Sequence, residues 1–152
     1  MLEHLAAAAG PTSKRPPFGF SAFMRVGFDE TDAQAVVYYG RYFPYCDRAR
    51  VEYQRHLRLL HTLPEGLEFV MRQTQCEYEA PARFDDEIEV FIRTAAVGRS
   101  SWRVEVAVHH CESGGLLARA EQVMVLIDRA GRQPTPVPDS WRDAVEAFEG
   151  GA

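Results

Sequence analysis

Apolar and polar residues alternate along several stretches of this chain, and a period of two is the pattern of a half-buried β-strand. In the first stretch, residues 18–28, apolar side chains occupy every second position. Four further stretches with strand character follow later: residues 69–78, 87–97, 101–111 and 116–128. Residues 112–115, Glu-Ser-Gly-Gly, have the composition of a hairpin turn between the last two. The pattern therefore predicts five strands, of which the last four follow one another directly.

Between the first and second predicted strands, apolar residues recur every three or four positions, which is the spacing of an amphipathic helix. This stretch covers residues 42–60, and Pro44 suits its first turn, where a missing N–H costs little. Its apolar positions are Phe43, Cys46, Ala49, Tyr53, Leu57 and Leu60. The other side is charged, so we expect one face of the helix to lie against a sheet. A shorter helix is expected at residues 140–148, after a loop at residues 131–138.

The order strand, long helix, four strands, short helix is typical of an α+β fold. We expect an antiparallel sheet of about five strands with the long helix on one face, and solvent or a second subunit on the other. The Gly10-Pro11 and Pro16-Pro17 pairs interrupt regular structure, so residues 1–17 are expected to form a flexible N-terminal tail. Residues 18–150 are then expected to form a single domain.

Composition narrows the class of protein. With 152 residues, 46% of them hydrophobic, the chain can build one domain with a full core. A net charge of −5 gives no reason to expect nucleic acid as a partner. The three cysteines have no metal-ligand spacing, which argues against a zinc site or a disulfide framework. No apolar run reaches the length of a membrane span, and no signal peptide is evident. We therefore expect a cytoplasmic protein.

The candidate chemistry lies where the first strand leads into the long helix. The connecting turn is acidic and contains Asp29, Glu30 and Asp32. It places a carboxylate beside a helix N-terminus, where backbone N–H groups lack partners and attract developing negative charge. A carboxylate next to such N–H groups can open an acyl thioester. The alternative is that Asp32 only caps the turn or the helix.

The same segment resembles the motif of the 4-hydroxybenzoyl-CoA thioesterase-like family, a branch of the hotdog-fold superfamily. The matching residues are Glu30-Thr31-Asp32-Ala33-Gln34-Ala35-Val36-Val37-Tyr38, then Tyr42, Tyr45 and Asp47-Arg48-Ala49-Arg50. Residues 78–86 and 97–101 also fit, so the resemblance covers about residues 20–140. It implies a hotdog fold, in which the sheet wraps around the long helix. It also implies a homodimer or a homotetramer built as a dimer of dimers, with the active site at the subunit interface.

The resemblance also implies roles for individual residues. Asp32 stands where the family has its catalytic carboxylate, which acts as nucleophile or general base in hydrolysing a fatty-acyl- or aryl-CoA to the free acid and CoA. The backbone N–H of Tyr39, or of its neighbour Gly40, would polarise the thioester carbonyl. The positions at which relatives hold the CoA tail are Gly98, Arg99, Ser100 and Ser101. No metal or other cofactor is expected, since coenzyme A is part of the substrate.

Two positions depart from the family pattern. Glu30 replaces the first Asp of the motif, and Ala35 replaces a Gly. If that Gly adopts a positive φ, Ala35 must do the same at a cost, or the turn has another shape. We expect Asp29 and Glu30 to be solvated turn residues without a direct role.

Three alternatives remain open at this point. The departures at Glu30 and Ala35 would suit a non-catalytic protein that binds acyl thioesters without hydrolysing them. A hotdog dehydratase is a further possibility, although those enzymes usually use a His, which this motif lacks. Another thioesterase lineage uses a carboxylate on the helix, for which Asp47 and Glu52 would be the candidates.

Overall fold

The computed structural model describes residues 7–150, with side chains from Arg15 onward. In chain order the elements are β1 (Ala7–Arg15), β2 (Phe18–Arg25), the 3-10 helices η1 (Phe28–Glu30) and η2 (Tyr39–Arg41), α1 (Tyr42–His56), β3 (Leu67–Tyr78), β4 (Glu87–Val97), β5 (Ser101–His110), β6 (Leu116–Asp128), β7 (Gln133–Pro134) and α2 (Asp139–Gly150).

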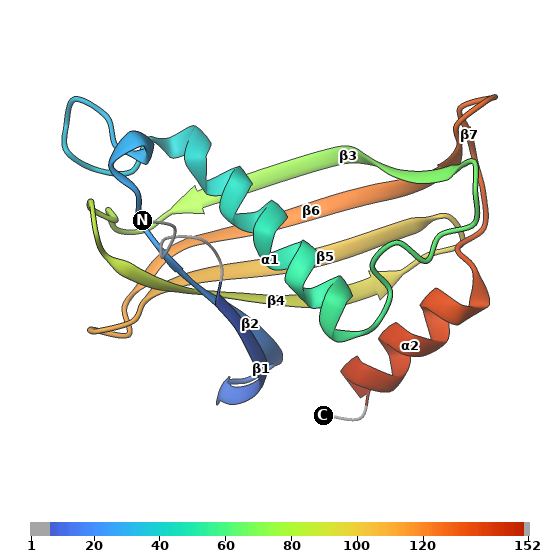
Figure 1. Cartoon of the computed structure of the whole chain (residues 1–152), viewed down its shortest axis with the longest axis horizontal. Helices are drawn as coiled ribbons and strands as arrows, with labels where there is room; N and C mark the ends of the chain where they lie inside the picture. Colours follow the sequence, from blue (N-terminus) through green and yellow to red (C-terminus); the bar gives the residue numbers. More distant parts are fainter. Residues whose placement is uncertain (1–6, 151–152) are drawn as a thin grey trace.

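One antiparallel sheet contains all the strands, in the order β1-β2-β4-β5-β6-β3, and the short β7 pairs with β6. Helix α1 crosses this sheet on one face, packing on β2 and β4, and α2 lies at one end of the molecule (Figure 1). The predicted α+β class, with a long helix on an antiparallel sheet, is confirmed. Within residues 7–150, no helix combines the length and the apolar character needed to cross a membrane.

The N-terminal residues differ from the prediction. Residues 7–15, which the prolines predict to have no regular structure, form strand β1. It pairs with β2 at the edge of the sheet, and the pairing shifts register around Pro11. An edge strand tolerates proline because one side of its backbone has no ladder partner. The predicted lack of regular structure is therefore wrong for these residues, and residues 1–6 lie outside the described part.

The other elements lie where the hydrophobic pattern predicts them, with differences at their ends. Strand β2 stops at Arg25, and Phe28 begins η1 instead of closing the strand. Helix α1 ends at His56 rather than at Leu60. The reason is Arg58, whose left-handed conformation (φ 61°) terminates the helix.

Alternate residues of the central strands form the core beneath α1. In β5 the core residues are Trp102, Val104, Val106 and Val108, each at most 2% exposed, as the alternation predicts. The buried face of α1 comprises Tyr42, Tyr45, Cys46, Ala49 and Tyr53. Burying one such large apolar side chain stabilises the fold by about 1.5–3 kcal/mol, so this layer fixes the position of α1 on the sheet.

Helix α2 is fastened to this core by a carboxylate near its C-terminus. Glu149 accepts hydrogen bonds from the Tyr53 hydroxyl and from the Thr94 backbone N–H, the latter at 2.9 Å. The pairing of β4 with β5 shifts register directly after this residue, between Thr94 and Ala96. The Thr94 hydroxyl in turn accepts from the Trp102 indole N–H at 2.8 Å. One carboxylate thus connects α1, α2 and β4.

We expect Glu149→Ala to lower the free energy of unfolding by about 2 kcal/mol, because it removes the acceptor of the Thr94 N–H and one partner of buried Tyr53. Urea denaturation followed by circular dichroism measures the change. The matched control is Glu146→Ala, an exposed position on the same helix, for which we expect less than about 0.5 kcal/mol. Equal effects of the two variants would contradict the role of Glu149.

Candidate active site

The acidic turn after β2 is closed by its own backbone hydrogen bonds. The Asp32 N–H donates to the Val36 carbonyl at 2.9 Å, and the Ala35 N–H donates to the Asp32 carbonyl at 2.9 Å. One carboxylate oxygen of Asp32 accepts from the Gln34 N–H at 2.8 Å. These bonds hold the Asp32 side chain in one orientation within a tight loop.

Ala35 adopts the left-handed conformation at the tip of this loop, with φ 64°. The backbone at position 35 therefore has the conformation that favours glycine, although the residue there is alanine. A left-handed L-residue costs about 1–2 kcal/mol, because its Cβ approaches the following carbonyl oxygen. The loop carries this strain immediately beside the candidate catalytic carboxylate.

Glu30 is not a solvated turn residue, which corrects the sequence-based expectation. Its side chain is buried, and Oε1 accepts from the Gly27 N–H at 2.8 Å and from the Tyr45 hydroxyl at 2.7 Å. The Arg48 guanidinium lies 3.6 Å from Oε2. These partners compensate the cost of burying a charge, and they tie the turn to α1. Burial, followed by the Glu30 contact, raises the pKa of Tyr45, so the phenol stays a donor.

The helix sequence contains a signal for the burial of Glu30. Tyr45 and Arg48 are three residues apart, so they share one face of α1 and both reach Glu30. Asp29, by contrast, is exposed, as expected.

Asp32 lines an open pocket of about 320 Å³. Its other walls come from the turn, the helix entry and the end of β3: Gln34, Val36, Val37, Tyr39, Tyr42, Tyr78, Glu79, Ala80 and Pro81. Pattern analysis did not identify Tyr78 or Glu79, because they reach the pocket only through the pairing of β3 within the sheet. The Val37 N–H donates to the Ala82 carbonyl at 2.8 Å and fixes the turn to this second segment.

The helix entry offers two backbone donors beside Asp32. The Tyr38 N–H donates to the Glu30 carbonyl at 2.9 Å, and the Arg41 N–H donates to the Tyr38 carbonyl at 2.8 Å. Between them, the N–H groups of Tyr39 and Gly40 have no acceptor within residues 7–150. Orphan donors of this kind begin every helix, and here they lie next to the pocket that Tyr39 lines. The predicted oxyanion donors therefore lie on the same side of the molecule as Asp32.

The predicted CoA-tail residues lie elsewhere: Gly98, Arg99 and Ser100 form the turn between β4 and β5, and Ser101 begins β5. Ser101 is in register with Val125, which pairs with Val70 of β3, whereas the pocket lies at Tyr78. Eight residues of strand correspond to about 26 Å. Figure 1 shows the two segments at opposite ends of the sheet. Within one chain, the structure does not bring these residues to Asp32.

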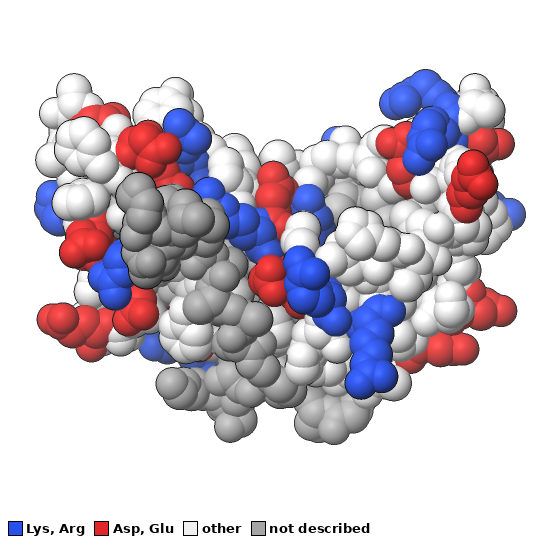
Figure 2. Space-filling view, viewed as in Figure 1, with Lys and Arg blue, Asp and Glu red and all other residues white. Residues whose placement is uncertain are grey.

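The helix carboxylates do not line the Asp32 pocket. Asp47 pairs with Arg50 at 2.9 Å, and Glu52 pairs with Arg55 at 3.3 Å. Both pairs belong to α1, along which charged side chains gather on the visible surface (Figure 2). The described residues contain no group of three or more His, Cys, Asp or Glu side chains that could hold a metal ion.

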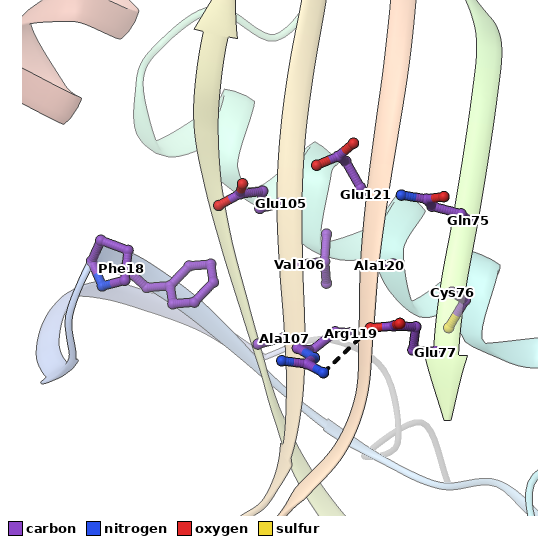
Figure 3. Close-up of a pocket in the computed structure, with 11 residues that line it drawn as sticks. Phe18, Gln75, Cys76, Glu77, Glu105, Val106, Ala107, Arg119, Ala120 and Glu121 are labelled. Carbon is purple, nitrogen blue, oxygen red and sulfur yellow. Dashed lines mark ion pairs between the residues drawn. The ribbon is translucent and has the colours of Figure 1, made fainter. Parts of the chain in front are cut away.

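A larger cavity of about 560 Å³ lies on the sheet face away from α1 (Figure 3). Its carboxylates are paired with arginines: Glu77 with Arg119 at 3.3 Å, and Glu121 with Arg103 at 3.1 Å. None of the residues predicted for the site lines it. The smaller pocket at Asp32 is therefore the better candidate active site.

We expect Ala35→Gly to raise the free energy of unfolding by about 0.5–1 kcal/mol, because glycine removes the left-handed strain but loses more chain entropy on folding. Thermal and urea denaturation measure it. Ala33→Gly, in the same loop but without a positive φ, should destabilise instead. A lower free energy of unfolding in Ala35→Gly would contradict the interpretation that Ala35 is strained.

Comparisons with known proteins identify the family of this chain. A family model described as the thioesterase-like superfamily matches residues 26–145. The acyl-CoA thioester hydrolase YbgC of Escherichia coli O6:H1 is 33% identical over 119 residues, which cover 77% of this chain and 88% of that protein.

Solved structures agree with the fold. A thioesterase-superfamily protein from Jannaschia sp. CCS1 superposes with a TM-score of 0.83 at 21% identity, covering 96% of this chain and 98% of that one. A 1,4-dihydroxy-2-naphthoyl-CoA thioesterase from Synechocystis gives a TM-score of 0.78 at 23% identity, covering 83% and 94%. These superpositions confirm the predicted hotdog fold. The chain therefore belongs to the thioesterase-like superfamily, which confirms the predicted family resemblance and the predicted class of enzyme, a thioester hydrolase.

Proposed function

We propose that this protein hydrolyses an acyl-CoA, with Asp32 as the catalytic carboxylate. One observation carries the proposal: Asp32 and Tyr39, whose backbone N–H has no acceptor within residues 7–150, line the same open pocket, and Gly40 follows Tyr39 directly. The E. coli relative, which is named an acyl-CoA thioester hydrolase, supports coenzyme A as the leaving group.

The reaction follows from this arrangement. The thioester carbonyl oxygen approaches the N–H groups of Tyr39 and Gly40, which stabilise the negative charge that develops on it. Asp32 either attacks the carbonyl carbon, giving a mixed anhydride that water then hydrolyses, or takes a proton from a water that attacks. Both routes break the carbon–sulfur bond and release CoA and the free acid.

The two departures from the family pattern leave this site intact. Glu30 is held by Gly27, Tyr45 and Arg48, and Ala35 adopts the left-handed conformation that the turn requires. The observations that motivated a non-catalytic, acyl-binding protein therefore no longer favour it.

We propose a homodimer that pairs along β3 as the catalytic unit. Strand β3 is twelve residues long and lies at the edge of the sheet, so one side of its backbone lacks a ladder partner in the monomer. Two copies related by a two-fold axis would pair these edges antiparallel. The Gly98–Ser101 end of one copy would then lie beside the Asp32 end of the other, and the distance of about 26 Å within one chain would no longer separate them.

The first test measures free-thiol release from a panel of fatty-acyl- and aryl-CoAs. We expect Asp32→Asn to lower kcat at least about 100-fold while the protein stays folded, because the carboxylate takes part in the chemical step. Asp29→Asn, at an exposed position of the same turn, is the control and should retain activity within about two-fold. Wild-type protein that binds acyl-CoAs but releases no thiol would instead support the acyl-binding alternative.

The second test addresses the dimer. Met71 is 42% exposed on β3, and Met71→Glu places a charge on the proposed interface. We expect it to shift the protein to a monomer in sedimentation experiments and to lower kcat/KM at least about ten-fold. Phe84→Glu, an exposed apolar position outside β3, should leave the oligomeric state unchanged. A wild-type monomer with full activity would refute the proposed dimer.

A further inference from the structure

We propose that Tyr78 is a positioning residue that fixes and polarises the peptide group between Tyr39 and Gly40, and thereby strengthens the Gly40 N–H as a donor to the thioester oxygen. This inference rests on the proposed function. Tyr78 is the last residue of β3 and lies outside the sequence motif that contains Asp32.

The contact itself joins two distant parts of the chain. The Tyr78 hydroxyl donates to the backbone carbonyl of Tyr39 at 3.0 Å. The Tyr78 ring packs edge-on against Tyr42 at 5.4 Å and against Tyr39 at 6.4 Å between ring centroids. Tyr78 also lines the Asp32 pocket. The hydroxyl is thus held against the first peptide group of the helix entry.

The planar peptide links the Tyr39 carbonyl, which Tyr78 contacts, to the Gly40 N–H. The carbonyl of Tyr39 and the N–H of Gly40 belong to one planar trans peptide and point in opposite directions. A hydrogen bond that holds the carbonyl therefore also sets the direction of the Gly40 N–H. That N–H has no acceptor of its own within residues 7–150, so it is free to meet a substrate.

The same contact strengthens the donor. A carbonyl that accepts a hydrogen bond polarises its peptide group, and the N–H at the other end then donates more strongly, by about 10–30%. Such polarisation matters most when negative charge develops on the substrate oxygen, which is in the transition state. Tyr78 should therefore affect kcat more than KM.

The phenol remains protonated over the pH range of an assay. Burial, followed by the contact with Cys76, raises the pKa of Tyr78 to about 12. Tyr78 is 45% exposed, and phenylalanine keeps its ring contacts with Tyr39 and Tyr42. The hydroxyl is what the substitution Tyr78→Phe removes.

The kinetic experiment compares Tyr78→Phe with wild type on the acyl-CoA that wild type cleaves fastest. We expect kcat to fall about ten-fold and KM to change less than about two-fold, a smaller loss than that of a direct oxyanion donor. The matched control is Glu77→Gln at the neighbouring position of β3, an exposed side chain that pairs with Arg119 and does not line the Asp32 pocket, and kcat should stay within about two-fold.

A spectroscopic readout separates polarisation from mere packing. In an Asp32→Asn background, the carbonyl stretching frequency of bound benzoyl-CoA reports the strength of the oxyanion donors. Adding Tyr78→Phe should move that frequency toward the value of free benzoyl-CoA, and adding Glu77→Gln should not.

Three outcomes decide the matter. An unchanged kcat in Tyr78→Phe, with an active wild type, overturns this inference alone and leaves Asp32 in place. A loss that appears only as a higher KM also overturns it, because it indicates a role in substrate binding. A wild-type protein that cleaves no acyl-CoA removes the proposed function and this inference with it.

Discussion

Helix α1 is held at both ends by a tyrosine that donates a hydrogen bond to a carboxylate. Tyr45, near the helix entry, bonds Glu30, and Tyr53, two turns later, bonds Glu149. Hydrogen bonds to charged groups of this kind contribute about 1.5–3 kcal/mol each and are directional, unlike the apolar core around them. The apolar layer fixes α1 to the sheet, and the two pairs determine what each helix end contacts.

The first pair matters most for the site. Glu30 lies two residues before Asp32, and its carbonyl also accepts from the Tyr38 N–H. A single residue therefore fixes the carboxylate loop on one side and the helix entry on the other. The strained conformation of Ala35 persists within this frame, because the bonds around it over-determine the turn. These bonds fix the position of Asp32 relative to the helix entry.

Much of the fold followed from the sequence, because periodicity reports burial directly. The alternation in β5 predicted its buried face, and the helical spacing of α1 predicted the burial of Cys46, Ala49 and Tyr53 but did not include Tyr45. The failures have a common cause in contacts between residues distant in sequence. An acidic residue such as Glu30 is normally exposed, and only its partners Tyr45 and Arg48 make its burial possible. Strand β1 was missed because proline rules assume a strand with two neighbours, whereas an edge strand has one.

In the candidate site too, local features could be predicted from the sequence, whereas contacts between distant residues could not. Asp32 and the helix entry are neighbours in the chain, so a local motif was enough to predict that they lie close together. Tyr78 and Glu79 reach the pocket through the register of β3 against β6, in which Tyr78 pairs with Ala118, and no local pattern encodes that register.

The second tyrosine–carboxylate pair acts at the other end of the molecule. Beside Glu149, the same helix α2 carries Arg142, which donates to the Gly98 carbonyl at 2.9 Å and to the Val97 carbonyl at 3.3 Å. The turn between β4 and β5 is thus fixed as firmly as the Asp32 loop, although the two lie about 26 Å apart along the sheet. Two rigid, separated segments cannot close on one substrate by bending within a chain. In the proposed dimer, an antiparallel pair of copies would join them without any movement, so the free edge of β3 is the part of the fold on which that proposal depends.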